Sequence, residues 1–149
     1  MVGVGVAKPK TIVWWIDGKR RCQTCKLYQD PSLYGKNVKS DDGRSPICKP
    51  CLRERELVKK YGITLKAYDE ILAAQKGGCA ICGITPEEAG KSLAVDHDHG
   101  CCGYRRDGRT CGKCTRALLC ESCNLGIGKF NDQADLLEKA AAYLRSFEQ

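Results

Sequence analysis

The residues of this 149-residue chain whose types could do chemistry gather in one run, Asp96-His97-Asp98-His99, which contains both of its histidines. Cysteine pairs frame the run, and Asn124 directly follows the downstream pair. Oxygen ligands from Asp and Asn suit Mg²⁺, which keeps most of its waters and binds phosphate oxygens. Histidine can take a proton from an attacking water near neutral pH. An Asp-His pair with an Asn therefore predicts a catalytic metal and a general base, which together serve hydrolysis of a phosphodiester bond.

The twelve cysteines indicate metal sites more strongly than disulfides. Ten of them fall in five pairs with the C-x-x-C spacing of zinc sites. With 42% hydrophobic residues, two Phe and one Met, the chain has little material for a large apolar core, so a staple is expected. The N-terminus lacks the basic region and the long apolar run of an export signal before Lys8. Residues 13–16 are too short an apolar stretch to span a membrane. We therefore expect zinc, a reducing cytoplasm and no membrane association, with an extracellular disulfide scaffold as the alternative.

Proximity along the chain divides eight cysteines into two sets of four. Each C-x-x-C pair presents two thiolates from one tight turn, and two such turns complete a tetrahedron around Zn²⁺. Four thiolates leave no coordination position open, so both zinc ions are expected to be structural. The first set is Cys22, Cys25, Cys48 and Cys51, and the second is Cys79, Cys82, Cys120 and Cys123.

A third set is less regular because two of its cysteines are adjacent. It comprises Cys101, Cys102, Cys111 and Cys114. A third Cys₄ zinc site is the favoured interpretation. Three of these cysteines with His99, or partly free thiols in a loop, are the alternatives. The version with His99 would remove that ring from the reactive run.

The pattern along the chain predicts a small, zinc-stabilised α+β protein whose N-terminal part is a Cys₄ zinc ribbon. Residues 1–18 are expected to form an N-terminal arm. The ribbon and a following helix occupy residues 19–61, with a short hairpin or loop between the cysteine pairs. The helical pattern runs over residues 49–61 and stops at Gly62.

The C-terminal domain is predicted over residues 62–149, with a compact core over residues 78–130. Thr64 is a suitable N-cap for a connecting helix that ends near Gly77. A terminal helix is expected after Asn131, where leucines and alanines recur at helical spacing. Its apolar stripe can pack on the core or form a dimer face.

A basic loop beside the reactive run is the best candidate for contact with DNA. Because four thiolates and one Zn²⁺ sum to −2, three such sites lower the formal charge of the chain from +7 to +1. The overall charge therefore says little about partners, and local clusters of charge matter more. The loop and the strand after it carry five cations with Asp107 as the only acid: Arg105, Arg106, Arg109, Lys113 and Arg116. Such cations can neutralise phosphates without reading bases; the alternative is a solvated rim of the third cysteine set.

The spacing of these motifs resembles that of the phage recombination endonuclease VII family, part of the HNH or ββα-metal nucleases. The likeness covers about residues 78–130. It rests on Cys79-Ala-Ile-Cys82-Gly, on Leu93-Ala-Val-Asp96-His97-Asp98-His99 and on Arg116-Ala-Leu-Leu-Cys120-Glu-Ser-Cys123-Asn124. Residues 22–61 look like the zinc ribbon often fused in front of such domains. The resemblance implies a DNA endonuclease that acts on duplex or branched DNA, including recombination junctions, in a bacterial or phage-infected cytoplasm.

The resemblance also implies a role for each residue of the reactive centre. By position, Asp96 and Asn124 correspond to the ligands of a catalytic divalent cation, Mg²⁺ or another. His97 corresponds to the general base, and His99 to an auxiliary residue that touches phosphate or orients the nucleophile. The Asp-His pair is expected to end one strand, a second strand follows, and a helix begins at the last cysteine pair. Adjacent strand residues point to opposite faces, so Asp96 and His97 converge only if the strand ends or bulges there.

The sequence departs from the family pattern in ways that leave substrate and assembly open. Ile127 stands where junction-resolving members can carry an acidic residue, and the segment that follows is short for an extensive helix-swapped dimer. The cysteine insertion after His99 rebuilds the path to the second strand. A homodimer is therefore one alternative among assemblies. The competing function is a non-catalytic zinc module that binds nucleic acid or protein.

Overall fold

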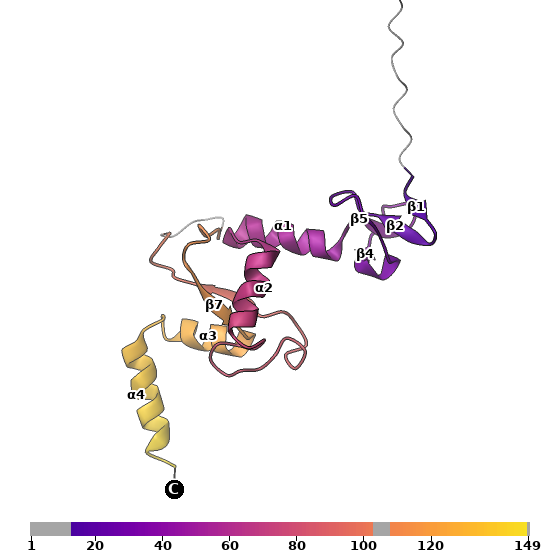
Figure 1. Cartoon of the computed structure of the whole chain (residues 1–149). Helices are drawn as coiled ribbons and strands as arrows, with labels where there is room; N and C mark the ends of the chain where they lie inside the picture. The colour runs from indigo at the N-terminus through magenta and orange to yellow at the C-terminus, as the bar shows by residue number, and fades with distance from the viewer. Residues whose placement is uncertain (1–12, 103–107, 149) are drawn as a thin grey trace, which may run out of the picture. The chain divides into compact units, whose positions relative to one another are not determined.

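A computed structural model describes residues 13–102 and 108–148 of the chain (Figure 1). Contacts divide the chain into two compact units, Met1–Arg55 and Glu56–Gln149. The domain limits predicted from the sequence, at residues 18 and 61, stay a prediction. None of the helices in the described part of the chain combines the length and the apolar character that a membrane crossing needs.

The first unit is built from short antiparallel strands. β1 (Trp15–Ile16), β2 (Lys19–Arg21) and β3 (Tyr28–Gln29) form a sheet in that order. After a 3₁₀ turn, η1 (Pro31–Leu33), β4 (Tyr34–Lys36) pairs with β5 (Arg44–Cys48). The predicted hairpin between the two cysteine pairs is thus confirmed, and α1 (Lys49–Tyr61) begins directly after it.

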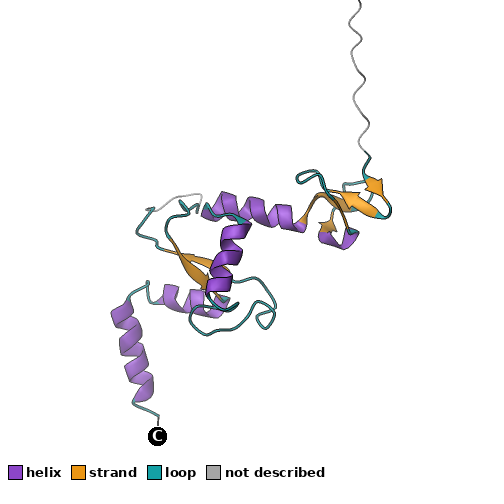
Figure 2. Ribbon diagram, viewed as in Figure 1, coloured by secondary structure: helices purple, strands orange, loops and turns teal. Residues whose placement is uncertain are grey.

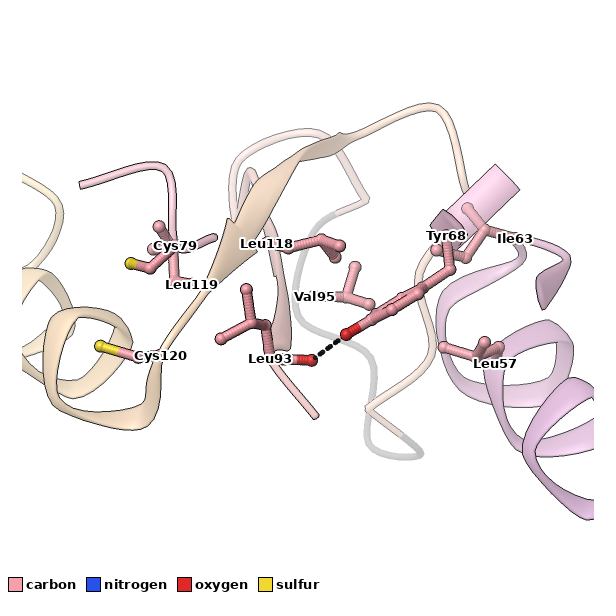
Figure 3. Close-up of a cluster of buried hydrophobic side chains, with 9 residues drawn as sticks. All are labelled: Leu57, Ile63, Tyr68, Cys79, Leu93, Val95, Leu118, Leu119 and Cys120. Atoms are coloured by element: carbon pink, nitrogen blue, oxygen red, sulfur yellow. Dashed lines mark hydrogen bonds between the residues drawn. The ribbon is translucent and has the colours of Figure 1, made fainter. Parts of the chain in front are cut away.

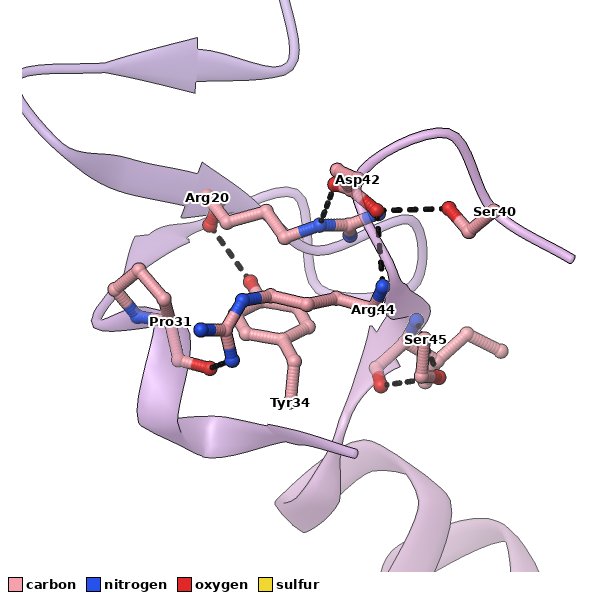
Figure 4. A network of polar contacts seen from close by, with 8 residues as sticks. Arg20, Pro31, Tyr34, Ser40, Asp42, Arg44 and Ser45 are labelled. Atoms are coloured by element: carbon pink, nitrogen blue, oxygen red, sulfur yellow. Dashed lines mark hydrogen bonds and ion pairs between the residues drawn. The ribbon is translucent and has the colours of Figure 1, made fainter. Parts of the chain in front are cut away.

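A polar network holds the hairpin of the first unit in place of a large core (Figure 4). The Arg20 side chain is 5% exposed, and its Nε donates to Asp42 Oδ2 at 2.7 Å. This hydrogen bond holds the pKa of Asp42 well below its usual range. The guanidinium lies 5.0 Å from the centroid of the Tyr34 ring, and the Tyr34 hydroxyl donates to the Arg20 carbonyl at 2.7 Å. Ser40 also donates to Asp42, which fixes the turn between the strands.

The second unit begins within α1. It then contains, in chain order, α2 (Leu65–Ala74), β6 (Ala94–His97), β7 (Thr115–Leu119), α3 (Glu121–Lys129) and α4 (Ala134–Arg145). The predicted helix limits are confirmed at α1, which ends before Gly62 in the left-handed region, with φ 67°. At α2 the predicted start is confirmed, because Thr64 Oγ1 accepts the Ala67 N–H at 3.1 Å as an N-cap does, whereas the helix ends at Ala74, before the predicted end near Gly77.

The core of the second unit is small and lies around the β6–β7 pair (Figure 3). Leu118 and Leu119 of β7 are 0% and 2% exposed. Tyr68 of α2 is buried beside them, and its hydroxyl donates to the Leu93 carbonyl at 2.9 Å. Residues from α1, from β6 and from the connecting turns complete the cluster: Leu57, Ile63, Cys79, Val95 and Cys120. This hydrogen bond and the packing together fix where β6 begins.

The side-chain amide of Gln75 extends the two-stranded sheet. Its Oε1 accepts the Leu118 N–H at 2.8 Å, and its Nε2 donates to the Leu118 carbonyl at 2.8 Å. The Ala80 N–H also donates to this carbonyl, at 3.1 Å. The outer edge of β7 is thereby paired, which matters because an isolated two-stranded sheet is marginally stable in water.

Three groups of four cysteines lie in the described chain with the geometry of zinc sites. Within each group, the sulfur atoms all lie within 4.8 Å of one another. Bonds of about 2.3 Å to a tetrahedral Zn²⁺ would separate the sulfurs by about 3.8 Å. The measured Sγ–Sγ distances of 3.7 Å for Cys82–Cys120 and 3.6 Å for Cys102–Cys114 match this spacing. All twelve cysteines are free, and these separations exceed the disulfide length of about 2 Å.

The members of the groups are those predicted from the spacing, the irregular third group included. They are Cys22, Cys25, Cys48 and Cys51; Cys79, Cys82, Cys120 and Cys123; and Cys101, Cys102, Cys111 and Cys114. His99 is a member of none of the groups found among the described residues. The geometry therefore favours the Cys₄ form of the third site over the form that would use His99.

The third cysteine group docks on the end of α1. The Thr110 N–H donates to the Lys60 carbonyl at 2.9 Å, and its hydroxyl donates to the Tyr61 carbonyl at 3.0 Å. These bonds satisfy two carbonyls that the end of the helix leaves without partners. Gly62 and Gly112 meet here so closely that a Cβ on Gly62 would lie 2.9 Å from the Gly112 nitrogen.

Zinc content tests the three groups. We expect the purified chain to hold three zinc ions, measured by plasma mass spectrometry against protein concentration. Replacing Cys111 with serine should lower the count to two, because the other groups lie on separate segments. A wild-type count near two would contradict the third site.

The close approach at Gly62 predicts a specific stability loss. In Gly62→Ala, the positive φ costs about 1–2 kcal/mol, and overlap with the Gly112 backbone adds about 1–3 kcal/mol. Gly90→Ala is the matched control, because Gly90 has φ 66° and nothing within 4 Å of the added Cβ. The melting temperature of zinc-loaded Gly62→Ala should fall further than that of Gly90→Ala. Equal losses would mean that the backbone contact contributes nothing.

Candidate active site

Two strands and a helix of the second unit, drawn as ribbons in Figure 2, position the reactive run. β6 and β7 pair antiparallel, and α3 follows β7 directly and packs against β6. Cys120 is the N-cap of α3, and its sulfur accepts the Cys123 N–H at 3.5 Å. The cysteine group that contains both residues therefore also fixes the start of the helix. This is the ββα arrangement expected from the sequence.

A β-bulge interrupts the strand pair at the reactive run. Asp96 lies opposite Ala117, whereas His97 lies opposite Thr115. Arg116 is consequently an extra residue on β7, without a partner in the register. A bulge of this kind re-aims the side chain of the extra residue. The sequence required β6 to end or bulge here; β6 ends at His97, and the bulge lies on the partner strand β7.

An open cleft of about 440 Å³ lies over this end of the strand pair. Val95 is 5% exposed and belongs to the core, so Asp96, its neighbour on the strand, faces the other way, toward the cleft. The predicted catalytic and metal-binding residues all line the cleft: Asp96, His97, His99 and Asn124. They come from β6, from the turn after it and from α3, and the fold brings them together.

Arg116 holds the Asp96 carboxylate by both oxygens. Its Nε donates to Asp96 Oδ2 at 2.7 Å, and its Nη2 donates to Oδ1 at 2.8 Å. The Asp96 side chain is 9% exposed and that of Arg116 is 38% exposed. The hydrogen bonds to Asp96 raise the pKa of Arg116 above its usual high value. Nη2 also lies 3.4 Å from Asp132 Oδ2, so one guanidinium contacts two carboxylates.

The two histidines stack at the mouth of the cleft. Their ring centroids are 4.6 Å apart, with an angle of 29° between the planes. The Tyr61 ring lies 6.2 Å from the His97 ring on the α1 side. His97 is half-buried and His99 is exposed. The stacked His99 ring and the tilted Tyr61 ring together limit the orientations that the His97 ring can take.

Asn124 occupies the first turn of α3. Its N–H donates to the Cys120 carbonyl at 2.9 Å, so its backbone position is set by the N-cap. Because α3 packs against β6, this turn faces the strand that carries Asp96. The helix thus carries an amide oxygen and the opposite strand a carboxylate into one cleft.

The donor set fits a divalent cation. The Asp96 carboxylate is nearly buried, and both of its oxygens accept hydrogen bonds from the Arg116 guanidinium. A buried anion needs a cationic partner of this kind. An amide from Asn124 supplies a neutral oxygen ligand in the same cleft. Carboxylate and amide oxygens with open space for water are the surroundings that Mg²⁺ prefers.

The five cations predicted to contact DNA differ in where they lie. Arg105 and Arg106 lie outside the described residues. Arg109 and Lys113 are exposed, on either side of Cys111. Arg116 points to Asp96 and Asp132 in the cleft. Contact of these five cations with DNA stays a prediction.

Four polar residues of the cleft were not among the predicted site residues: Lys60, Tyr61, Lys129 and Asp132. Lys60 and Tyr61 reach it from the end of α1, and Lys60 Nζ lies 5.0 Å from the Tyr61 ring centroid. Asp132 reaches it from the turn after α3, where Asn131 and Asp132 have φ of 53° and 56°. No sequence motif marks these residues; the only signal was the positive charge of Lys60, two residues before Gly62, where the helical pattern stops. Ile127, which replaces an acid of the family pattern, packs against the core.

The chain is similar to known proteins. A model of the recombination endonuclease VII family matches residues 54–146, more than half of the chain. A solved structure, the crystal structure of the beta-beta-alpha-Me type II restriction endonuclease Hpy99I, is 28% identical, with a TM-score of 0.35. The match covers 87% of this chain and 66% of that chain, so this chain spans slightly less than two thirds of that protein. No curated protein matches. Because the family match extends over the whole ββα frame and its cleft, the chain belongs to the recombination endonuclease VII family.

Proposed function

We propose that the chain is an endonuclease that hydrolyses phosphodiester bonds in DNA with the help of a divalent cation. One observation carries the proposal: Asp96, His97 and Asn124, from a strand and a facing helix, line a single open cleft. Family membership supports the same reaction. A non-catalytic zinc module would require the cysteine groups but would not require these three side chains to converge.

In this proposal, each residue of the cleft has a distinct role. Asp96 and Asn124 hold the cation, which supplies charge stabilisation to the phosphate and to the leaving oxygen. His97 takes the proton of the attacking water, and the stacked ring of His99 and the neighbouring ring of Tyr61 hold His97 in orientation. The new bond joins the water oxygen to phosphorus as the phosphorus–oxygen bond to the leaving group breaks. Lys60 provides a positive charge on the cleft wall for the substrate phosphates.

The substrate is proposed to be duplex or branched DNA. The cleft is open rather than enclosed, which suits a polymer that passes across it. Exposed Arg109 and Lys113 offer charges for the backbone beside the cleft. Parallel assays on supercoiled plasmid and on a four-way junction of matched length would separate plain duplex cleavage from junction resolution.

Replacing the general base tests the proposed reaction. His97→Ala should lower the rate of plasmid cleavage in Mg²⁺ by at least about 100-fold, the usual range for loss of a general base. Its zinc content and melting temperature should match those of the wild type, because His97 is at the end of its strand and outside the core.

The matched control is Lys66→Ala, on the exposed face of α2, which should cleave at the wild-type rate. EDTA should stop wild-type cleavage. Full activity of His97→Ala would refute the assignment of the base. No cleavage of plasmid or junction by zinc-loaded wild type would favour the binding module.

A further inference from the structure

The carboxylate proposed to bind the cation is already occupied by a side chain of the same chain. Both Asp96 oxygens accept hydrogen bonds from Arg116, at 2.7 and 2.8 Å. A guanidinium fork uses one lone pair on each carboxylate oxygen and places a positive charge directly against the group. A divalent cation that binds Asp96 must therefore either displace Arg116 or share the carboxylate with a like charge at close range.

The contact between Arg116 and Asp96 follows from the geometry of the strand pair. Arg116 is the extra residue of the β7 bulge, and the bulge re-aims its side chain toward the neighbour of Ala117 across the sheet, which is Asp96. Without the extra residue, consecutive β7 side chains would alternate between faces. The bulge thus presents a competing cation to the metal ligand.

Asp132 is a second hydrogen-bond acceptor for Arg116. Asp132 Oδ2 is 3.4 Å from Nη2, the same nitrogen that bonds Asp96 Oδ1. Its backbone is held after α3 by a hydrogen bond from its N–H to the Ile127 carbonyl at 3.1 Å. Asp132 also has φ 56°, a left-handed conformation that a non-glycine residue seldom adopts. The turn therefore fixes a carboxylate where the released guanidinium can keep an anionic partner.

We propose that Arg116 competes with the divalent cation for Asp96 and that Asp132 receives the guanidinium when the cation binds. Arg116 and Asp132 are then positioning residues that set how readily the cleft takes its metal. The exchange keeps charges paired, because Asp96 passes from one cation to another while Arg116 passes from one carboxylate to another. This inference rests on the proposed function only in its use of Asp96 as a metal ligand.

The test is a titration of Mn²⁺ onto zinc-loaded protein without DNA, read by the electron paramagnetic resonance of free Mn²⁺. Mn²⁺ takes oxygen ligands and leaves thiolate zinc sites in place. If Arg116 occupies Asp96 in nine molecules of ten, the apparent Kd exceeds the intrinsic Kd by about tenfold. Arg116→Gln should therefore bind Mn²⁺ about tenfold more tightly than wild type. Arg116→Lys, which keeps the charge but loses the planar fork, should lie between them.

The role of Asp132 is tested by a double-variant cycle. Asp132→Asn should weaken Mn²⁺ binding in the wild-type background, because Arg116 then has only Asp96. In the Arg116→Gln background the same change should have no effect, within about twofold, because the competitor is gone. An equal loss in both backgrounds would overturn this role and make Asp132 a direct ligand.

Lys129→Gln is the control for charge alone, because Lys129 lines the same cleft and its removal deletes one positive charge. It should change the Kd less than Arg116→Gln does. Equal gains for the two variants, or an unchanged Kd in Arg116→Gln, would overturn the competition. Absence of Mn²⁺ binding in every variant would refute both the competition and the metal site of the proposed function. The expected pattern of Kd values in a protein that cleaves no DNA would refute the proposed function alone.

Discussion

The second unit depends on the staple formed by Cys79, Cys82, Cys120 and Cys123. Its sheet has only two strands, and its core is too small to hold them alone. The cysteine group joins the turn at Cys79 and Cys82, which precedes β6, to Cys120, the N-cap of α3. It therefore fixes the start of this helix relative to that turn. Zinc binding at such a site contributes about 10–16 kcal/mol in small peptides, comparable with the whole stability of a domain.

With the frame fixed, the chemistry of the cleft follows from backbone details. The β7 bulge places Arg116 on the Asp96 carboxylate, and the N-cap places Asn124 in the first turn of α3. The third cysteine group adjoins the reactive run, where the Asp98 N–H donates to the Cys114 carbonyl at 2.9 Å. Through Thr110 the same segment holds the end of α1, from which Lys60 and Tyr61 reach the cleft. Two of the cysteine groups thus position the helices α3 and α1, which line the cleft beside β6.

Much of the fold could be predicted from the sequence because its signals are local. The α1 limits follow from a helical pattern that stops at Gly62, and the cysteine groups follow from ligand spacing. The convergence of Asp96, His97 and Asn124 on one cleft was predicted through the resemblance to a nuclease family. The contact of Arg116 with Asp96 could not be predicted, because a bulge adds one residue to a strand without a sequence signal. Arg116 also lies in a basic stretch, so it was predicted to contact DNA. Asp132 was missed because its place depends on two left-handed residues after α3.

The most direct test of the central claim, that Asp96 and Asn124 form a cation site, is anomalous diffraction at the manganese edge from crystals soaked in Mn²⁺. One manganese peak is expected in the cleft beside Asp96 and Asn124, with the Arg116 guanidinium withdrawn from Asp96. Asn124→Ala crystals should lose this peak or show it at reduced occupancy. A cleft without manganese, with Arg116 still on both Asp96 oxygens at saturating Mn²⁺, would contradict the account.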